Sequence, residues 1–398
     1  MEFRPILSTL LRNRTGALLI ALQIALTMAV VINSVFIILD RAETMRQPLG
    51  IDEEALIVAH VISVGGDVDV RSVTEQDIRV LEAIDGVERV AKISTMPLSN
   101  SGSSSTYHLS EEPRSPTVGV AYYEGDMNVL ETLGLEITRG RWFRDEEIIY
   151  DPDEGAVPAV TILSDSAAKE FFGDEDPLGR FIYTGTGRGI EVIGTMRMLS
   201  RPWYNWGNFY DTALMPFVEG NYQYVIRVDP ARREALVPVI EQALVDIDPD
   251  RLVARTRTHL ETIANTYARD IAMNRMLSIV MLLVVLITSL GIIGLASFSV
   301  AQRRRQIGTR RAIGARRYHI LRYFLVENWL ITSGGIALGL VLSFVVNHFL
   351  VSEYNMPKLD AIFLPLVAVG LWFIGLLATL GPARNAATID PAIATRNV

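Results

Sequence analysis

Apolar residues are concentrated in four long windows that contain no Asp, Glu, Lys or Arg. These windows are Gly16–Leu39, Met276–Ala301, Asn328–Val351 and Ala361–Pro382. A helix needs about 20 apolar residues to cross the roughly 30 Å hydrocarbon core of a bilayer, and each window is long enough. The pattern therefore predicts four transmembrane helices, at residues 16–39, 276–301, 328–351 and 361–382.

The segment before the first window is amphipathic. Apolar residues recur at helical spacing in residues 1–15, and Arg4, Arg12 and Arg14 lie at other positions, which predicts a short cytoplasmic or interfacial helix. The first window is longer than the apolar part of a secretion signal, and no small-residue cleavage motif follows it. We therefore interpret residues 16–39 as an uncleaved membrane anchor.

Residues 40–274 separate the first two windows and show the shorter patterns of a mixed α/β domain. Two stretches have the order strand–helix–strand. The first has strands at 55–64 and 87–94 around a helix at 75–84 capped by Thr74, and the second has strands at 223–228 and 251–256 around a helix at 231–247. This repeat predicts a split βαβ, ferredoxin-like module within an α+β domain.

The part between the two repeats, at about 117–219, is expected to be an inserted subdomain of short strands with one helix, Asp165–Phe172. Ser99–Ser105 has the composition of a flexible linker, and Gly185–Gly189 that of a hairpin turn. From Thr258 through the second window there is no proline, so we expect one long helix that continues from the domain into the membrane.

Charge is distributed unevenly along the chain. Residues 40–274 contain 22 Lys and Arg against 40 Asp and Glu, whereas the whole chain has a net charge of −8. Residues 302–322 contain eight arginines and no acid. Because short cytoplasmic loops are basic, 302–322 and both termini, including the tail 383–398, are expected in the cytoplasm, and residues 40–274 in the periplasm.

Several classes of catalytic site are excluded by residue type and spacing. A P-loop needs Gly-Lys-Ser/Thr, and none of the three lysines follows a glycine. The five histidines are scattered, and there is no cysteine. We therefore expect no enzymatic activity, no cofactor, no metal site and no nucleic-acid partner for this polypeptide.

The basic segment 302–322 is the strongest local signal. It serves at least as a membrane anchor, but its glycines recur among arginines, which favours a short helix at Arg310–Tyr318 with turns at Gly308 and Gly314. Arginine donors on such a helix suit a groove on a cytoplasmic partner. The candidate coupling residues are Gly308, Arg310, Arg311, Gly314, Arg316, Arg317 and Tyr318.

The same segment resembles the coupling region of FtsX/MacB-type ABC transporter permeases, with the approximate pattern R-R-x-E-I-G-x-x-R-A-L-G-A. Gln306 and Ile313 depart from that pattern. Residues 382–396 are similar to the closing motif of the family, and residues 160–182 to the MacB-like core-domain signature. The resemblance covers nearly the whole chain.

The resemblance implies a porter-like external domain and a non-catalytic permease subunit of an ABC exporter. In that family, ATP hydrolysis by a separate ATPase is relayed through the helices to the external domain (mechanotransmission), which drives efflux of a periplasmic substrate. The implied partners are this ATPase, which binds the ATP, a second permease copy or a paralogue, membrane lipids, and a periplasmic adaptor with an outer-membrane channel. The implied location is the bacterial inner membrane.

Two alternatives stay open. The first is a family member that does not export but extracts lipoproteins or regulates cell-wall hydrolases. The second is a membrane-anchored receptor, although a receptor would be expected to have two spans and a cytoplasmic signalling coiled coil.

Overall fold

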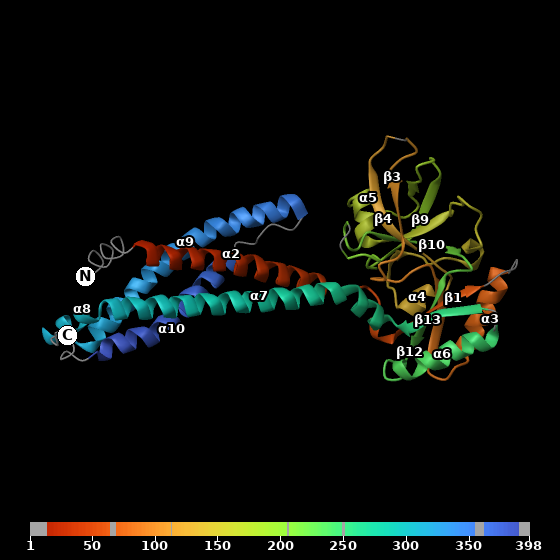
Figure 1. Ribbon diagram of the computed structural model, residues 1–398. Coiled ribbons are helices and arrows are strands. Elements are labelled where there is room, and N and C mark those ends of the chain that lie inside the picture. Colours follow the sequence, from red (N-terminus) through yellow and green to blue (C-terminus); the bar gives the residue numbers. More distant parts are fainter. Residues whose placement is uncertain are drawn as a thin grey trace. The chain divides into compact units, whose positions relative to one another are not determined.

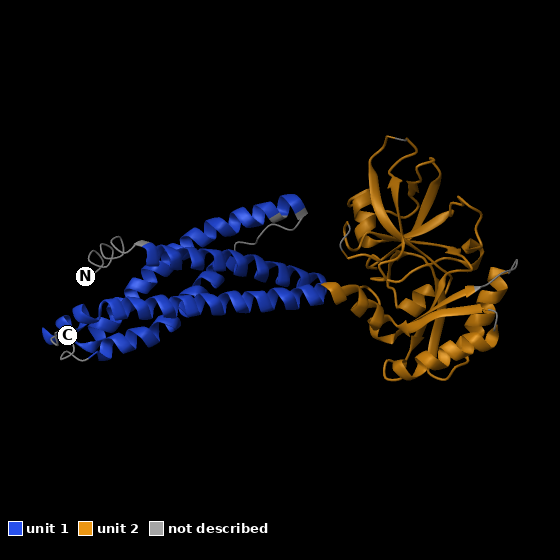
Figure 2. Cartoon of the chain, in the orientation of Figure 1, with its two compact units in different colours: residues 1–45, 270–398 blue, residues 46–269 orange. Residues whose placement is uncertain are grey.

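The computed structural model describes residues 14–63, 69–112, 114–204, 207–248, 251–354 and 362–389. The chain divides into two compact units (Figure 2): a helical unit of residues 1–45 and 270–398, and an α/β unit of residues 46–269. The expected interfacial helix at residues 1–15 and most of the expected tail at 383–398 lie outside the described residues.

In the described part of the chain, four helices are long and apolar enough to cross a membrane (Figure 1), as the hydrophobic windows predict. They are α2 (Arg14–Thr44), α7 (His259–Gln302), α9 (Arg317–Tyr354) and α10 (Phe363–Thr388), and a shorter helix, α8 (Arg304–Ala312), lies between α7 and α9. Helices α2, α7 and α9 extend beyond their apolar windows at both ends, and α10 extends beyond its window at the C-terminal end. The long helix predicted from Thr258 onwards is confirmed as α7.

Helix α2 packs closely against α9 in the helical unit. A Cβ atom at Gly335 or Gly339 of α9 would lie within 2.8 Å of atoms of α2, so only glycine permits this approach, as is common between membrane helices. Buried Ile24, Met28 and Ile32 of α2 contribute to the apolar core beside them.

Polar contacts join the other helices of this unit. The hydroxyl groups of Thr27 on α2 and Thr288 on α7 are hydrogen-bonded at 2.6 Å, and the side-chain amide of Asn328 on α9 donates to the carbonyl of Gly375 on α10 at 2.9 Å. Since apolar lipid cannot satisfy these groups, the bonds favour one packing arrangement.

The first and last parts of the α/β unit together form the predicted split βαβ module. Its four strands are all antiparallel and run in the order β13-β1-β12-β2. Helices α3 and α6 pack on one face, over a core that includes Ile57, Tyr224 and Ile240. The bounds are β1 (Leu56–Ser63), α3 (Val70–Glu82), β2 (Val87–Ile93), β12 (Gln223–Val228), α6 (Arg233–Ile247) and β13 (Arg251–Thr258).

The middle of the unit forms a seven-stranded sheet in the order β5-β9-β7-β10-β4-β3-β8, and an additional β8–β9 pairing closes six of these strands into a barrel. Helix α5 (Asp165–Phe172) packs on it, as predicted, and begins where Ser164 accepts a hydrogen bond from the backbone of Ala167 at 3.1 Å. The strands are β3 (Ser103–His108), β4 (Thr117–Glu124), β5 (Ile137–Gly140), β7 (Val160–Ser164), β8 (Phe181–Tyr183), β9 (Gly189–Met196) and β10 (Thr212–Met215).

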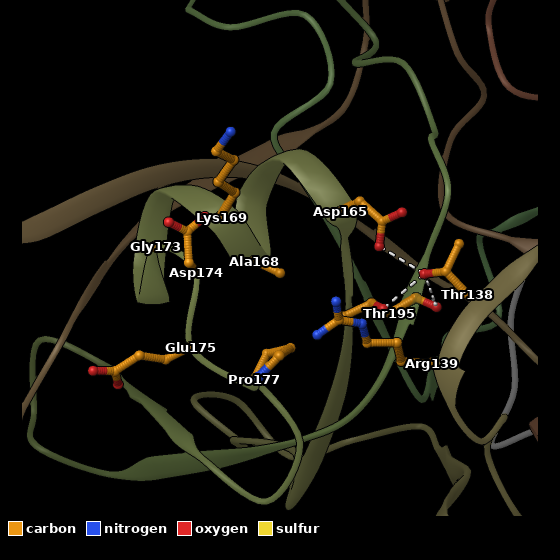
Figure 3. A pocket seen from close by; sticks show the side chains of 10 residues that line it. All are labelled: Thr138, Arg139, Asp165, Ala168, Lys169, Gly173, Asp174, Glu175, Pro177 and Thr195. Carbon is orange, nitrogen blue, oxygen red and sulfur yellow. Dashed lines mark hydrogen bonds between the residues drawn. The ribbon is translucent and has the colours of Figure 1, made fainter.

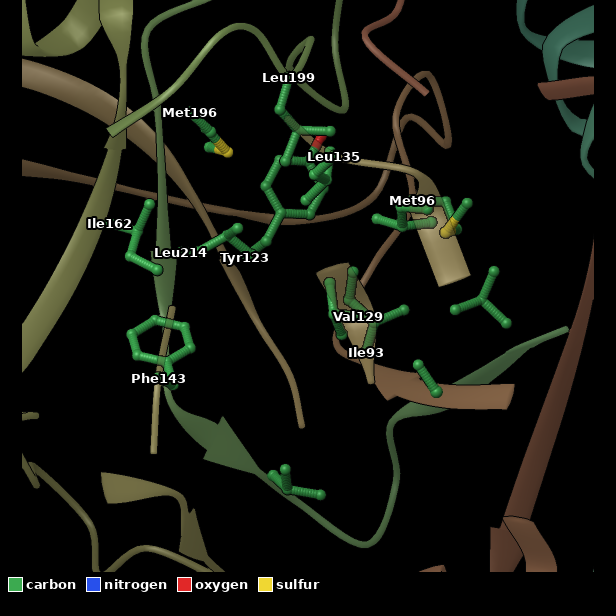
Figure 4. Packing of buried hydrophobic residues seen from close by; sticks show 14 of the residues in the cluster. Ile93, Met96, Tyr123, Val129, Leu135, Phe143, Ile162, Met196, Leu199 and Leu214 are labelled. Atoms are coloured by element: carbon green, nitrogen blue, oxygen red, sulfur yellow. The ribbon is translucent and has the colours of Figure 1, made fainter. Parts of the chain in front are cut away.

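A core of buried side chains joins the two sheets within this unit (Figure 4). Ile93 of the first sheet, Tyr123 of the second and Val129 of the short helix α4 (Val129–Leu133) all belong to it. A short pair of strands, β6 (Ile149–Tyr150) and β11 (Phe217–Val218), lies beside them, with the single turns η1 (Glu53–Ala55) and η2 (Asp145–Glu147). The inserted subdomain and the split βαβ module therefore share a core.

Three local predictions were wrong. Helix α3 is capped by Asp69, whose carboxylate accepts from the backbone of Arg71 and Ser72, and Thr74 is buried inside the helix. The predicted linker Ser99–Ser105 runs into β3, because its serines pair with β4 through the backbone. The insertion also contains a second helix, α4, which is too short to show periodicity. The hairpin turn at Gly185–Gly189 is confirmed, between β8 and β9.

Candidate functional site

The basic segment 302–322 contains a break between two helices. Helix α8 ends at Ala312 and α9 starts at Arg317, with Gly314 at φ +102° between them. The expected helix at Arg310–Tyr318 is therefore wrong: the helix lies earlier, and the turn falls inside the expected range. Gly308 is buried within α8 and makes no turn.

An apolar cluster attaches α8 to the ends of two membrane helices. Ile307 of α8 packs with Ile320 and Phe324 of α9 and with Ala383 and Ala386 of α10, all of them buried. Through this cluster α8 packs directly against α9 and α10, so a force on α8 would act on both of these helices.

Three arginines add polar and cation–π contacts around this apolar cluster. Arg303 donates to both carboxylate oxygens of Glu327 at 3.0 Å, and Arg311 donates to the carbonyl of Ile389. The Arg310 guanidinium lies over the Tyr323 ring, 5.4 Å from its centroid. Arg310 also lines a cavity of about 60 Å³ between α8 and α9. Arg310 and Arg311 therefore already have contacts within the unit.

The remaining candidates face outwards on the turn that follows α8 and on the first turn of α9. We call Ala312–His319 the coupling turn. Arg316 and Arg317 are exposed, the Tyr318 side chain is 63% exposed, and Ile313 is 83% exposed. An exposed apolar pair beside two guanidinium groups is the composition of a protein-binding surface with an apolar centre and a charged rim.

The candidates therefore fall into three groups. Arg316, Arg317 and Tyr318 are available to a partner, Gly314 forms the turn, and Gly308, Arg310 and Arg311 hold α8 in place. Sequence reasoning missed Ile313, the most exposed large apolar residue of the turn. An isolated isoleucine among arginines and glycines was the signal that could have identified it.

The α/β unit has a second candidate site, a pocket of about 450 Å³ beside α5 (Figure 3). Its lining carries both charges: Arg139 and Lys169 are basic, and Asp174 and Glu175 are acidic. The fifth charged residue, Asp165, accepts a hydrogen bond from the Thr138 hydroxyl at 2.6 Å. Charges of both signs and this hydroxyl–carboxylate contact give the pocket the composition of a polar surface cleft.

The groups with strongly shifted pKa values lie elsewhere, inside the α/β unit. Burial lowers the pKa of Lys92 to about 8, and burial raises the pKa of Asp126 to about 7. Neither residue lines the pocket beside α5. Shifted pKa values next to a cleft would suggest catalysis, whereas these two groups are enclosed in the core. Among the described residues, no three His, Asp or Glu side chains form a possible metal site.

Family models match most of the chain. The model of the MacB-like periplasmic core domain matches residues 17–262, and that of the FtsX-like permease C-terminal region matches residues 278–391.

Three related proteins illustrate the similarity. The macrolide export ATP-binding/permease protein MacB of Vibrio parahaemolyticus is 26% identical over 343 residues, which are 81% of this chain and 48% of that protein. The uncharacterized ABC transporter permease YknZ of Bacillus subtilis is 26% identical over 338 residues, 81% of this chain and 79% of that protein. The crystal structure of the periplasmic region of MacB from Actinobacillus actinomycetemcomitans has 15% identity and a TM-score of 0.35, and the match covers 57% of this chain and 98% of that one. The chain spans about half the length of the MacB proteins that it matches.

Proposed function

The chain belongs to the family of ABC transporter permeases that combine a MacB-like periplasmic core domain with an FtsX-like permease domain, and we propose that it relays the motion of a separate ATPase to its periplasmic domain. It is a multi-pass membrane protein with four long apolar helices. The relay would drive efflux of a periplasmic substrate, with the chain itself as the non-catalytic subunit.

The coupling turn is the observation that carries this proposal. It combines exposed Ile313 and Tyr318 with Arg316 and Arg317, at the end of the helical unit where α8 packs against α9 and α10. Arginine forms bidentate contacts with carboxylates, and an exposed apolar side chain supplies a desolvated centre. An ATPase surface with an apolar groove and acidic rim would fit this turn.

The contacts of α8 with α9 and α10 support transmission of movement from the turn into the membrane helices. A rotation of α8 would be resisted by the Arg303–Glu327 ion pair and by the apolar cluster around Ile307. Both Arg303 and Glu327 are largely buried, and a close-packed contact transmits displacement rather than absorbing it. Movement of the turn would therefore pass to α9 and α10.

Helix α7 supports the second step of the relay. It is one helix, of which residues 259–269 belong to the α/β unit and the remainder to the helical unit. Within the α/β unit, Thr266 donates to the carbonyl of Leu98 at 2.5 Å and accepts from the side chain of Asn100 at 3.2 Å. Leu98 and Asn100 belong to the segment between β2 and β3, so a shift of α7 would act on the connection between the two sheets.

The assembly that we propose contains a separate ABC ATPase and a second permease, either a copy of this chain or a paralogue. A periplasmic adaptor and an outer-membrane channel complete the efflux path. In this arrangement the protein lies in the bacterial inner membrane, with both termini and residues 302–322 in the cytoplasm. The eight arginines of that loop support this orientation.

Site-specific photocrosslinking tests the relay at its first contact. A photoreactive amino acid at Ile313 or Tyr318 should crosslink to the ATPase in membranes that contain both proteins. The same amino acid at Phe373, which is 62% exposed on α10, serves as the control and should yield no ATPase adduct. Adducts of equal yield at Phe373 and Ile313, or none at either turn position, would contradict the proposal.

A further inference from the structure

Strand β13 forms an outer edge of the four-stranded sheet. It pairs with β1 on one side, and the sheet order places no strand on its other side. Within the described residues, no backbone hydrogen bond joins 252–257 to any segment except β1. The outward N–H and C=O groups of β13 are therefore available to an added strand.

Two arginines lie next to each other on one face of this edge strand. Arg255 is paired across the ladder with His60, and Arg257 with Val58. Because side chains alternate along a strand, residues two positions apart share a face. This face is opposite to α3 and α6, since Ile57, Ala59 and Val61 point towards those helices.

No acidic side chain forms an ion pair with these arginines in the described part of the chain. Most arginines of the α/β unit do form such pairs, among them Arg71, Arg89 and Arg227. Arg255 is exposed, and the Nε of Arg257 is buried without a hydrogen-bond partner. Glu261 acts electrostatically on Arg257 without reaching ion-pair distance.

The positive charges on this face repel one another. Burial lowers the pKa of His60, and the positive charges of Arg257 and Arg255 lower it further. Burial also lowers the pKa of Arg257, with a further contribution from Arg255, which Glu261 partly offsets. An anion bound here would relieve this repulsion.

Apolar side chains continue the same face towards the start of β13. Leu252 is paired with Ile62 across the ladder, and their side chains are 55% and 47% exposed. The face thus presents two guanidinium groups and then an apolar pair along a single free strand edge. A small anion would contact only the arginines, whereas an extended polypeptide could contact the two guanidinium groups, the apolar pair and the free backbone groups of the edge.

We propose that the free edge of β13 is a docking site for an acidic, extended segment of a partner protein. The segment adds as a further strand, and its carboxylates meet Arg255 and Arg257. Strand addition of this type takes its affinity from the backbone and its specificity from alternate side chains. The proposal is independent of ATPase coupling, because it involves only the α/β unit.

The spacing of the arginines defines the ligand. Residues two apart on a strand are separated by roughly 6.6 Å, so the carboxylates must also be two residues apart. The probe is therefore a short capped peptide in which Glu alternates with Thr and that ends in Val. The matched control peptide has the same composition with its Glu residues adjacent, so that successive carboxylates point to opposite faces.

Fluorescence anisotropy with the full chain in detergent measures binding of both peptides. We expect the alternating peptide to bind more tightly than the control peptide, with an affinity that falls as salt rises. The double variant Arg255→Glu/Arg257→Glu should weaken binding by roughly tenfold or more. The matched protein control, Arg79→Glu/Arg197→Glu, reverses two exposed arginines elsewhere in the α/β unit and should bind as the unmodified chain does.

Hydrogen exchange then identifies the mode of binding. The alternating peptide should protect amides in 251–258, and Arg255→Gln/Arg257→Gln provides a charge-neutral variant if the double reversal fails to fold. Absence of peptide binding, or equal peptide affinity of the variant and the protein control, would overturn the proposal. So would inorganic phosphate or anionic-lipid nanodiscs that bind, block the peptide and leave the amides of 251–258 unprotected. Protection of these amides that rises with protein concentration in the absence of peptide would instead indicate a second copy of the chain at this edge, and would also overturn the proposal.

Discussion

Removal of the Asp77 carboxylate should destabilise the α/β unit more than removal of any surface carboxylate. Asp77 lies on α3 and is completely buried. It accepts hydrogen bonds from the two terminal nitrogens of Arg251 at 2.5 and 3.0 Å, and from the Tyr224 hydroxyl at 2.5 Å. Lys92 is also buried, with its Nζ 5.0 Å from the centroid of the Tyr224 ring.

The magnitude follows from the charges that Asp77→Ala would leave behind. Among the described residues, Arg251 would keep only Asp248, at 3.2 Å, and Lys92 would lose its main buried counter-charge. Removal of one partner of a buried ion pair costs about 3–5 kcal/mol. For a unit of this size, that corresponds to a fall of roughly 6–20 °C in the unfolding midpoint.

The assay is thermal unfolding of the full chain in detergent, with hydrogen exchange to locate the change. Exchange should accelerate in α3, β12 and β13, which this network joins. The matched control is Glu136→Ala, which removes a carboxylate from an exposed ion pair with Arg197 and should change the midpoint little. Equal midpoints for the two variants would refute the view that this network stabilises the unit.

Three further predictions concern protonation, topology and nucleotide binding. Burial lowers the pKa of Lys92 to about 8 in the folded chain, against 10.5 for an ordinary lysine, so Lys92→Met should raise the unfolding free energy by up to about 3 kcal/mol at pH 7. This gain should shrink between pH 8 and 10.5, and a pH-independent difference would contradict the prediction. Single cysteines at exposed Ser103 and Thr309 should react with an impermeant maleimide from the periplasmic and the cytoplasmic side respectively, and the reverse pattern would overturn the orientation. The purified chain should not bind ATP, because it contains no Gly-Lys-Ser/Thr, and saturable binding in equilibrium dialysis would contradict this.

The fold could be predicted from the sequence where hydrophobic periodicity is strong. The four membrane helices and the helices at Asp165–Phe172 and near Arg233–Ile247 follow from it, since burial of an apolar face determines each of them. The closure of the barrel could not be predicted, because it depends on the long-range pairing of β3 with β8, between His108 and Tyr183, whereas the β8–β9 hairpin is local. Asp69 and Thr74 are both good capping residues, and they differ in whether residues 70–73 are helical; Val70 of this first turn packs against the core.

The candidate site was predictable in location but not in detail. Eight arginines identified the segment, but its helix boundary depends on which glycine adopts a positive φ, and Gly314 rather than Gly308 does so. The division of the arginines into internal and exposed groups depends on tertiary contacts, such as that of Arg311 with Ile389. Spacing along the sequence carries no information about those contacts.

The central claim is that the coupling turn binds the ATPase, and co-purification of the two proteins tests it most directly. Arg316→Glu/Arg317→Glu changes only exposed side chains of the turn, whereas Arg311 is unsuitable because it holds Ile389. The matched control Arg304→Glu/Arg305→Glu makes the same charge change at exposed positions of α8, outside the turn.

At equal membrane levels, recovery of the ATPase with Arg316→Glu/Arg317→Glu should fall at least tenfold below that with the unmodified chain. Loss of a buried Arg–carboxylate contact costs about 2–5 kcal/mol, which exceeds the 1.4 kcal/mol of a tenfold change. The control should retain most of its ATPase. Equal recovery with both variants and the unmodified chain, together with normal transport, would mean that the segment is only a membrane anchor and would contradict the account.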